Sequence, residues 1–215
     1  MIFDHTHPDY IKARDRIGKH RYNGAYYYSK EITEYIIPNV KTDRNWVTLN
    51  VPGHCWDHTI FFVHPNWHIH SIDWLKDFND LILVCSWEEI IPKVEHMGKT
   101  IYLPMSVDVP YVEQFKKAEK TKDVCFYGRN VKAKFGGGIP EGVPMLTGKP
   151  RHELLAELAD YRRCYCTERC AIEAKILDVE VLPYMDMFPD PNRWQVLDSR
   201  EAAVMLQKEL DKIEG

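Results

Sequence analysis

The feature that most constrains the fold is an alternation of short, continuous apolar runs with longer segments of helical character. Such runs, rich in β-branched and aromatic residues, are typical of strands buried on both faces. Strands are expected over residues 46–51, 59–64, 81–86, 100–103, 123–127, 143–147, 163–167 and 179–183. Helices are expected over residues 25–37, 87–97, 111–119, 152–159, 168–177 and 200–213. This alternation predicts an α/β protein with parallel sheets.

Residues 104–122 have the composition of a hinge between two domains. Pro104 ends a predicted strand, Pro110 begins a short helix, and a lysine-rich stretch leads into the next strand. We place the boundary near residue 108, which gives an N-terminal domain of residues 1–108 and a C-terminal domain of residues 109–215. Each is predicted to be a small Rossmann-like domain, with the two parallel sheets facing a cleft that holds the ligand.

The composition is that of a globular chain, with 45% hydrophobic and 28% charged residues. No apolar run approaches the ~18 residues of a membrane span, and the acidic start of the chain argues against a signal peptide. Six cysteines without a dense framework favour a reduced protein, so we expect a cytoplasmic location. Residues 51–113 and 151–215 are net acidic and residues 114–150 net basic, and such alternation suits an anionic ligand.

The segment that follows the predicted strand 123–127 carries a pattern typical of phosphate binding. Gly128 and Arg129 come directly after the strand, and Lys134 lies in the same loop. At the carboxyl end of a parallel strand, glycine lets the backbone approach a ligand and arginine can bind phosphate oxygens with two nitrogens. Two cations there would stabilise a diphosphate leaving group, whose charge grows as the bond to it breaks. A solvated basic loop is the alternative interpretation.

Residues 165–177 are predicted to form a strand end, a turn and a helix, with Thr167 able to cap the helix and Glu168 in its first turn. Glu173 lies among apolar neighbours, where a carboxylate needs a partner. A ribose diol would be such a partner, because a carboxylate can accept two hydroxyl hydrogens. The alternative is one glutamate at the helix start and one on its surface.

The order of these segments is similar to that of the GT-B glycosyltransferases, especially the large retaining family 4. Residues 80–86 resemble the last strand of the family's N-terminal domain, and residues 101–108 (IYLPMSVD) resemble its interdomain iPNGVD segment. Residues 126–129 (FYGR), together with Lys134, resemble its fvGR…K diphosphate clamp. Residues 172–174 (IEA) resemble its lEA helix. The resemblance implies that Arg129 and Lys134 bind the diphosphate of a nucleotide sugar, with a UDP-sugar favoured, and that Glu173 binds its ribose. It implies no metal and no further cofactor.

The N-terminal half adds three candidate residues. Residues 22–25 resemble the family's glycine-containing loop, which places Gly24 near the donor and acceptor. Residues 61–64 resemble the strand whose terminal histidine contacts the donor sugar, which makes His64 a candidate catalytic residue. Asp57 is the nearest acidic residue to this segment on its N-terminal side, and we consider it as a catalytic base if the reaction inverts the anomeric centre.

The sequence also departs from the family pattern. The family's paired glutamates lie eight positions apart as EGFGLxxxE, whereas Glu168 and Glu173 lie five apart with no glycine between them. The assignment of Glu168 to the donor site therefore rests on a weaker correspondence. The family also has a longer N-terminal domain and a C-terminal helix that returns to it, and this chain is expected to be shortened at both.

The expected function is the transfer of a sugar from a nucleotide-diphosphate donor to an acceptor hydroxyl. Cations alternate with aromatic residues over positions 12–30, a pattern that can hold phosphates and stack bases. Nucleic acid, such as a modified base in viral DNA, is therefore one candidate acceptor. A solvated helix followed by tyrosines of the core is the alternative interpretation of this segment.

Two other classes of function remain open. His5 and His7 resemble the opening HxH metal pair of amidohydrolase-type enzymes, in which a bound Zn²⁺ activates water. A non-catalytic nucleotide-binding module is the third possibility. Cys164 and Cys166 lack the CxxC spacing of a zinc site, and alternation along a strand would send them to opposite faces.

Overall fold

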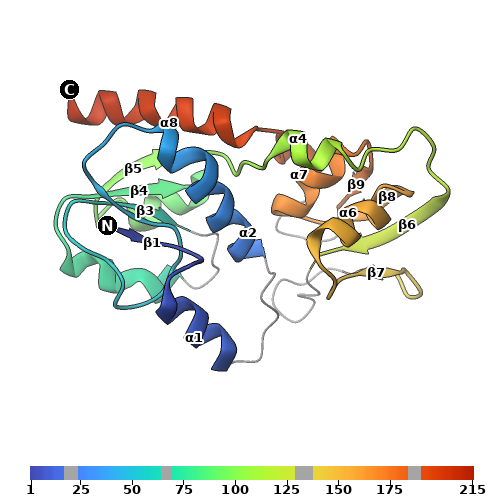
Figure 1. Cartoon of the computed structure of the whole chain (residues 1–215), viewed down its shortest axis with the longest axis horizontal. Coiled ribbons are helices and arrows are strands. Elements are labelled where there is room, and N and C mark those ends of the chain that lie inside the picture. Colours follow the sequence, from blue (N-terminus) through green and yellow to red (C-terminus); the bar gives the residue numbers. More distant parts are fainter. Residues whose placement is uncertain (17–23, 64–68, 129–137, 184–189) are drawn as a thin grey trace. The chain divides into compact units, whose positions relative to one another are not determined.

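The computed structural model describes residues 1–16, 24–63, 69–128, 138–183 and 190–215 (Figure 1). Over these residues the chain forms two compact units, one of residues 1–105 together with 199–215, and one of residues 106–198. Each unit contains one parallel sheet, which confirms the predicted α/β class. Within the described ranges, no helix has the length and apolar character that a membrane crossing requires.

The first unit is built on a five-stranded sheet in which every neighbouring pair is parallel. Its strands follow one another across the sheet in chain order: β1 (Ile2–Phe3), β2 (Asn45–Val47), β3 (Thr59–Val63), β4 (Leu81–Cys85) and β5 (Lys99–Tyr102). Every residue of β3 and β4 is buried, as the continuous apolar runs predict. Because the order never reverses, this sheet has no topological switch point.

The first unit also contains helical segments, which lie between its strands, except between β2 and β3, and at the end of the chain. They are α1 (Pro8–Arg16), α2 (Gly24–Glu31), the π-helical η1 (Ile32–Ile36), the 3₁₀ segments η2 (Ile37–Asn39), η3 (Ile69–Asp77) and η4 (Glu88–Ile90), α3 (Ile91–Val94) and the last helix, α8 (Ser199–Glu214). The single helix expected over residues 25–37 is therefore divided into α, π and 3₁₀ parts. Its last part contains Pro38, which cannot donate the backbone hydrogen bond of a regular helix.

Helix α8 comes last in the chain but belongs to the first unit. One of its faces is buried and packs against η1 and η2, through Ala202, Ala203, Leu206 and Leu210. Near its end, Glu214 accepts a hydrogen bond from Nε of the buried Arg44. This packing corrects the expected C-terminal domain of residues 109–215, and also the expectation that a returning helix is missing.

The second unit is built on a four-stranded parallel sheet with the order β7-β6-β8-β9. Its strands are β6 (Lys122–Tyr127), β7 (Met145–Leu146), β8 (Tyr161–Tyr165) and β9 (Glu180–Leu182). Its helical segments are α4 (Val109–Glu113), α6 (Arg151–Leu158), α7 (Glu168–Ile176) and the 3₁₀ segment η5 (Pro191–Arg193). Helix α7 packs against α4 and β9.

Each of the eight predicted strands overlaps a strand of the structure, and their ends differ by at most four residues. Strand β1 was not predicted, because two residues are too few to show a periodic pattern. Helix α1 was also missed, and the helix expected over residues 111–119 ends at Glu113. Single i→i+3 turns follow there, with the amide of Phe115 bonded to the carbonyl of Val112.

The packing of α8 predicts the effect of truncating its side chains. Leu206 is fully buried, so Leu206→Ala should lower the free energy of unfolding by about 2–5 kcal/mol through lost burial and the cavity left behind. Val204 lies on the same helix but is 56% exposed, so Val204→Ala should change the free energy of unfolding by no more than about 0.5 kcal/mol. Urea denaturation followed by circular dichroism measures both. Equal, small losses in the two variants would contradict the packing of α8 on the first unit.

Candidate functional site

The candidate site lies at the carboxyl edge of the second unit's sheet, where β6 and β8 run side by side. From β6 the chain goes to β7 on one side and then returns to β8 on the other, so the order reverses between β6 and β8. Such a switch point is where parallel α/β sheets bind their ligands, outside the carboxyl ends of the strands. Phe126 pairs with Tyr165 at this edge, and both strands lead directly into residues predicted to bind the donor.

Gly128 follows β6 and has a backbone conformation that glycine adopts without strain, with φ at +130°. Its amide donates a hydrogen bond of 3.3 Å to the carbonyl of Leu146, the last residue of the neighbouring β7. A Cβ placed on Gly128 would lie 3.4 Å from Sγ of Cys170, in the first turns of α7. The glycine thus lets the end of β6 approach the start of α7 closely.

Glu168 is the first residue of α7 and lies at the same edge. Its φ is +56°, a left-handed conformation that few residues other than glycine adopt and that often marks a functional site. Burial raises the pKa of its carboxyl to about 7, so the group is half-protonated near neutral pH. Thr167 precedes it in an extended conformation at the N-cap position, but its side chain makes no capping hydrogen bond within the described part of the chain.

Glu173 lies one and a half turns further along α7 and is the centre of a buried ion-pair network. Its Oε1 accepts hydrogen bonds from Nε of Arg151 at 2.9 Å and Nε of Arg169 at 3.0 Å. Nη2 of Arg151 lies 2.8 Å from the same oxygen, and the hydroxyl of Tyr127 donates to Oε2. Burial alone would raise the pKa of Glu173, but the two arginines and the tyrosine hold it below 4.5.

These partners change the interpretation of Glu173. The resemblance implies that its carboxylate binds ribose, but the side chain is 2% exposed and both oxygens already accept from protein donors. A ribose diol would have to displace Tyr127 or an arginine from a buried position, leaving a charge or hydroxyl without its partner. In this structure Glu173 joins β6, α6 and α7 to one another, which is a structural role.

Asp57 is also placed differently from the prediction. It lies just before β3, at the edge of the first sheet where the strands begin, whereas ligands of parallel sheets bind at the edge where strands end. Its Oδ1 accepts a hydrogen bond of 2.7 Å from the amide of Asn79, and its carbonyl accepts one from the side chain of Asn45. These contacts favour a structural role for Asp57 over that of a catalytic base, since it connects β2 with the loop that precedes β4.

Three of the predicted site residues, His64, Arg129 and Lys134, lie outside the described residues. His64 directly follows β3 in the chain, and Arg129 directly follows Gly128. Gly24 is the first residue of α2. The tyrosines of the segment 12–30 differ in burial. Tyr28 is 3% exposed and packs edge-on against Phe62 in the core, whereas Tyr26 and Tyr27 are half-buried.

The structure separates the predicted metal pair of His5 and His7. The ring of His5 packs edge-on against Tyr26, and burial lowers its pKa. His7 instead lies beside Asp9 and His54, and these three residues bring ligand atoms within 4.8 Å of one another. Asp9 and His54 were not predicted as ligands, because His54 is distant in the sequence and forms no motif with the HxH pair.

Cys164 and Cys166 also differ from the prediction that they point to opposite faces. Their Sγ atoms lie 3.1 Å apart, because side chains two residues apart along an extended chain point to the same side; the expectation of opposite faces misapplied the alternation. All six cysteines are free thiols, and burial raises the pKa of Cys166 well above 9.

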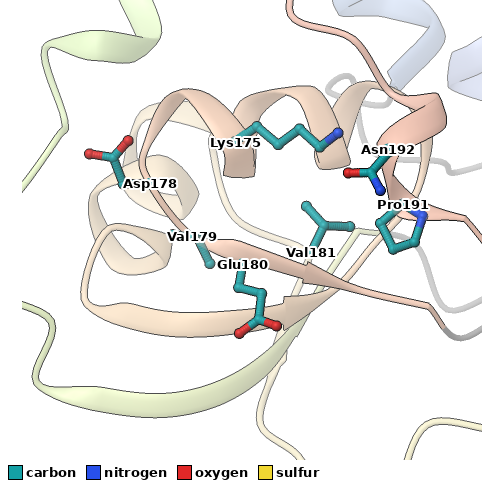
Figure 2. A pocket seen from close by; sticks show the side chains of 7 residues that line it. All are labelled: Lys175, Asp178, Val179, Glu180, Val181, Pro191 and Asn192. Carbon is teal, nitrogen blue, oxygen red and sulfur yellow. The ribbon is translucent and has the colours of Figure 1, made fainter.

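An open hollow of about 530 Å³ lies on the second unit beside the edge strand β9, lined by Lys175, Asp178, Val179, Glu180, Val181, Pro191 and Asn192 (Figure 2). Nζ of Lys175 donates to the carbonyl of Trp194 at 2.6 Å. The hollow is near the beginning of β9, away from the carboxyl ends of β6 and β8. We therefore assign the candidate site to the switch point and not to this hollow.

Comparisons with known proteins add no assignment: no protein-family model matches the chain, and no curated protein and no solved structure matches it.

The network around Glu173 predicts a large effect of neutralising it. Glu173→Gln should lower the free energy of unfolding by about 3–5 kcal/mol, because Arg151 and Arg169 would remain buried without their counter-charge. Glu153→Gln on the exposed surface of α6 is the control and should have little effect. Urea denaturation at pH 7 measures both.

The same substitution should remove a step in acid denaturation. The pKa of Glu173 is lowered in the folded protein, so its stabilisation is present above about pH 4.5 and is lost as the pH falls through the lower folded-state pKa. A wild-type protein and a Glu173→Gln variant with equal stability at pH 7 would contradict this account of the network.

Proposed function

We propose that the chain is a glycosyltransferase that uses a nucleotide-diphosphate sugar as its donor and binds it at the switch point of the second unit. The observation that carries the proposal is the meeting of Gly128 and the start of α7 between β6 and β8. Backbone amides at the start of a helix favour negative charge, and the approach of Gly128 to Cys170 places the end of β6 beside the start of α7. This is the chemistry that a diphosphate needs.

In this proposal Arg129 and Lys134 provide the positive charges, since they follow Gly128 in the chain. Negative charge accumulates on the diphosphate as the glycosidic bond breaks, so cations held there stabilise the transition state more than the bound donor. The resemblance assigns His64, which follows β3 in the chain, to the donor sugar, and Gly24 to the donor and acceptor. Two α/β units and a last helix that packs on the first unit are consistent with the GT-B resemblance.

Glu168, and not Glu173, is the carboxylate that we assign to the hydroxyls of the donor. Glu173 is already paired with Arg151, Arg169 and Tyr127, whereas Glu168 begins the helix at the ligand edge in a left-handed conformation. Burial raises the pKa of the Glu168 carboxyl, so a ligand hydroxyl that donates a hydrogen bond to it would stabilise its ionised form. The acceptor is proposed to present a hydroxyl group, with nucleic acid as one candidate.

The first test is binding of nucleoside diphosphates and release of them from nucleotide sugars. UDP, GDP, ADP and CDP are compared in thermal unfolding, where a ligand at 100 times its dissociation constant adds about 2.7 kcal/mol of stability. Arg129→Ala should lower the rate of sugar transfer or donor hydrolysis by about 10²–10³-fold. Arg162→Ala, at an exposed position of β8, is the matched control and should leave the rate unchanged.

The outcomes separate the classes of function. Stabilisation by a nucleoside diphosphate without turnover would support the non-catalytic module instead. Unchanged turnover in the Arg129→Ala variant would remove the proposed mechanism.

The second test uses the pH dependence of donor binding. Because the pKa of Glu168 is raised to about 7, its carboxylate is ionised above that pH and protonated below it. Donor affinity should therefore fall as the pH drops from 8 to 6, and Glu168→Gln should bind weakly with little change over this range. Glu157→Gln, at a surface position of α6, should keep the wild-type profile. A pH profile that survives in Glu168→Gln would exclude Glu168 from the donor site.

A further inference from the structure

Three side chains of the first unit, His7, Asp9 and His54, form a compact group of metal-ligating atoms. One atom from each residue lies within 4.8 Å of the others. Nε2 of His54 is 3.3 Å from Oδ2 of Asp9, and Nδ1 of His7 is 3.9 Å from the same oxygen. A tetrahedral ion with bonds of about 2.0–2.1 Å holds its ligands about 3.4 Å apart, so small side-chain rotations would close the group around an ion.

The fold holds the two histidine rings in place. Phe3 is fully buried on β1, and its ring lies 4.3 Å from that of His54, stacked, and 4.6 Å from that of His7. Pro52 and Gly53 form a tight turn in which the amide of His54 bonds to the carbonyl of Val51 at 3.3 Å, with φ of Gly53 at +82°. This turn brings His54 back to the carboxyl end of β1.

The two ring nitrogens of His54 have different neighbours. Nδ1 lies 3.3 Å from the carbonyl of Pro52, which can only accept a hydrogen bond. Nε2 faces Oδ2 of Asp9 at 3.3 Å and is the nitrogen available to bind a cation beside that oxygen. A carbonyl that fixes the other ring nitrogen is also the usual outer partner of a metal-binding histidine.

We propose that His7, Asp9 and His54 form a binding site for a divalent transition-metal ion such as Zn²⁺. Two imidazoles and one carboxylate suit ions of this class, whereas Mg²⁺ and Ca²⁺ prefer oxygen ligands. The three side chains are 25–52% exposed, which leaves the remaining coordination positions to water. Lys12 lies 3.8 Å from the other oxygen of Asp9, so the carboxylate binds the ion through one oxygen.

The ion would connect two loops of the first unit. His7 and Asp9 belong to the segment that leaves β1 and begins α1, and His54 belongs to the loop between β2 and β3. Bound metal would therefore stabilise this edge of the sheet, in addition to any chemistry at its water-occupied positions. None of these three residues belongs to the proposed donor site, so the metal site does not depend on it.

The test is titration of the purified full-length chain with Zn²⁺, measured by calorimetry and by competition with a chromophoric chelator. The wild type should bind one Zn²⁺ saturably and gain thermal stability on binding. Asp9→Asn and His54→Ala should each weaken binding by about 100-fold or more, since loss of even an outer-shell partner costs 10–100-fold. His152→Ala removes an exposed histidine of the second unit and should bind like the wild type.

Cysteine binding is distinguished by titration with Co²⁺, whose spectrum shows a thiolate charge-transfer band only when sulfur coordinates. The proposal expects no such band, and d–d absorption that disappears in His54→Ala. Circular dichroism of Asp9→Asn confirms that it is folded, since Asp9 is exposed. No saturable binding, a thiolate band, or wild-type affinity in both Asp9→Asn and His54→Ala would each overturn the proposal.

Discussion

The organisation of the second unit depends on how one buried carboxylate, Glu173, is neutralised. Its partners come from different elements: Tyr127 from β6, Arg151 from α6 and Arg169 from α7. A buried charge without a partner is strongly destabilising, so these elements can be packed together only in the arrangement that completes the network. That arrangement also sets where α7 begins, beside the end of β6. The geometry of the candidate donor site is thus a consequence of an interaction that itself lies below the surface.

The same packing around α7 accounts for the unusual backbone conformation at the switch point. Glu168 has a left-handed φ of +56°, which costs of order 1–3 kcal/mol in a residue other than glycine. Such strain persists only where the surrounding structure determines the conformation. Here the helix that Glu168 begins is fixed five residues later by Glu173, and the end of β6 is fixed against the same helix by the close approach of Gly128 to Cys170. One of the four described residues other than glycine that have a positive φ thus lies at the edge where a ligand would bind.

The sequence predicts the strands well because their burial on both faces leaves continuous apolar runs, as in β3 and β4. It does not predict partners that are distant in the chain. Glu173 could be recognised as a buried carboxylate in need of a partner, but Arg151, 22 residues away, was indistinguishable from a surface arginine. The packing of α8 on the first unit was not predicted for the same reason, since an apolar helix face does not identify the surface that it covers. Gly128 was proposed from a strand end, which is a local feature, and Glu168 from its place in the first turn of a predicted helix and from the resemblance to the family's paired glutamates.

The two sheets share a class but differ in how their carboxyl edges can be used. In the second unit the reversal between β6 and β8 separates the following connections, so that the ends of two adjacent strands remain available to a ligand. The first sheet never reverses. At its carboxyl edge the loop carrying His54 returns to Phe3 and to the start of α1, where it meets His7 and Asp9. This edge suits a small ion held by side chains, and an edge with a switch point suits a larger anion held partly by the backbone.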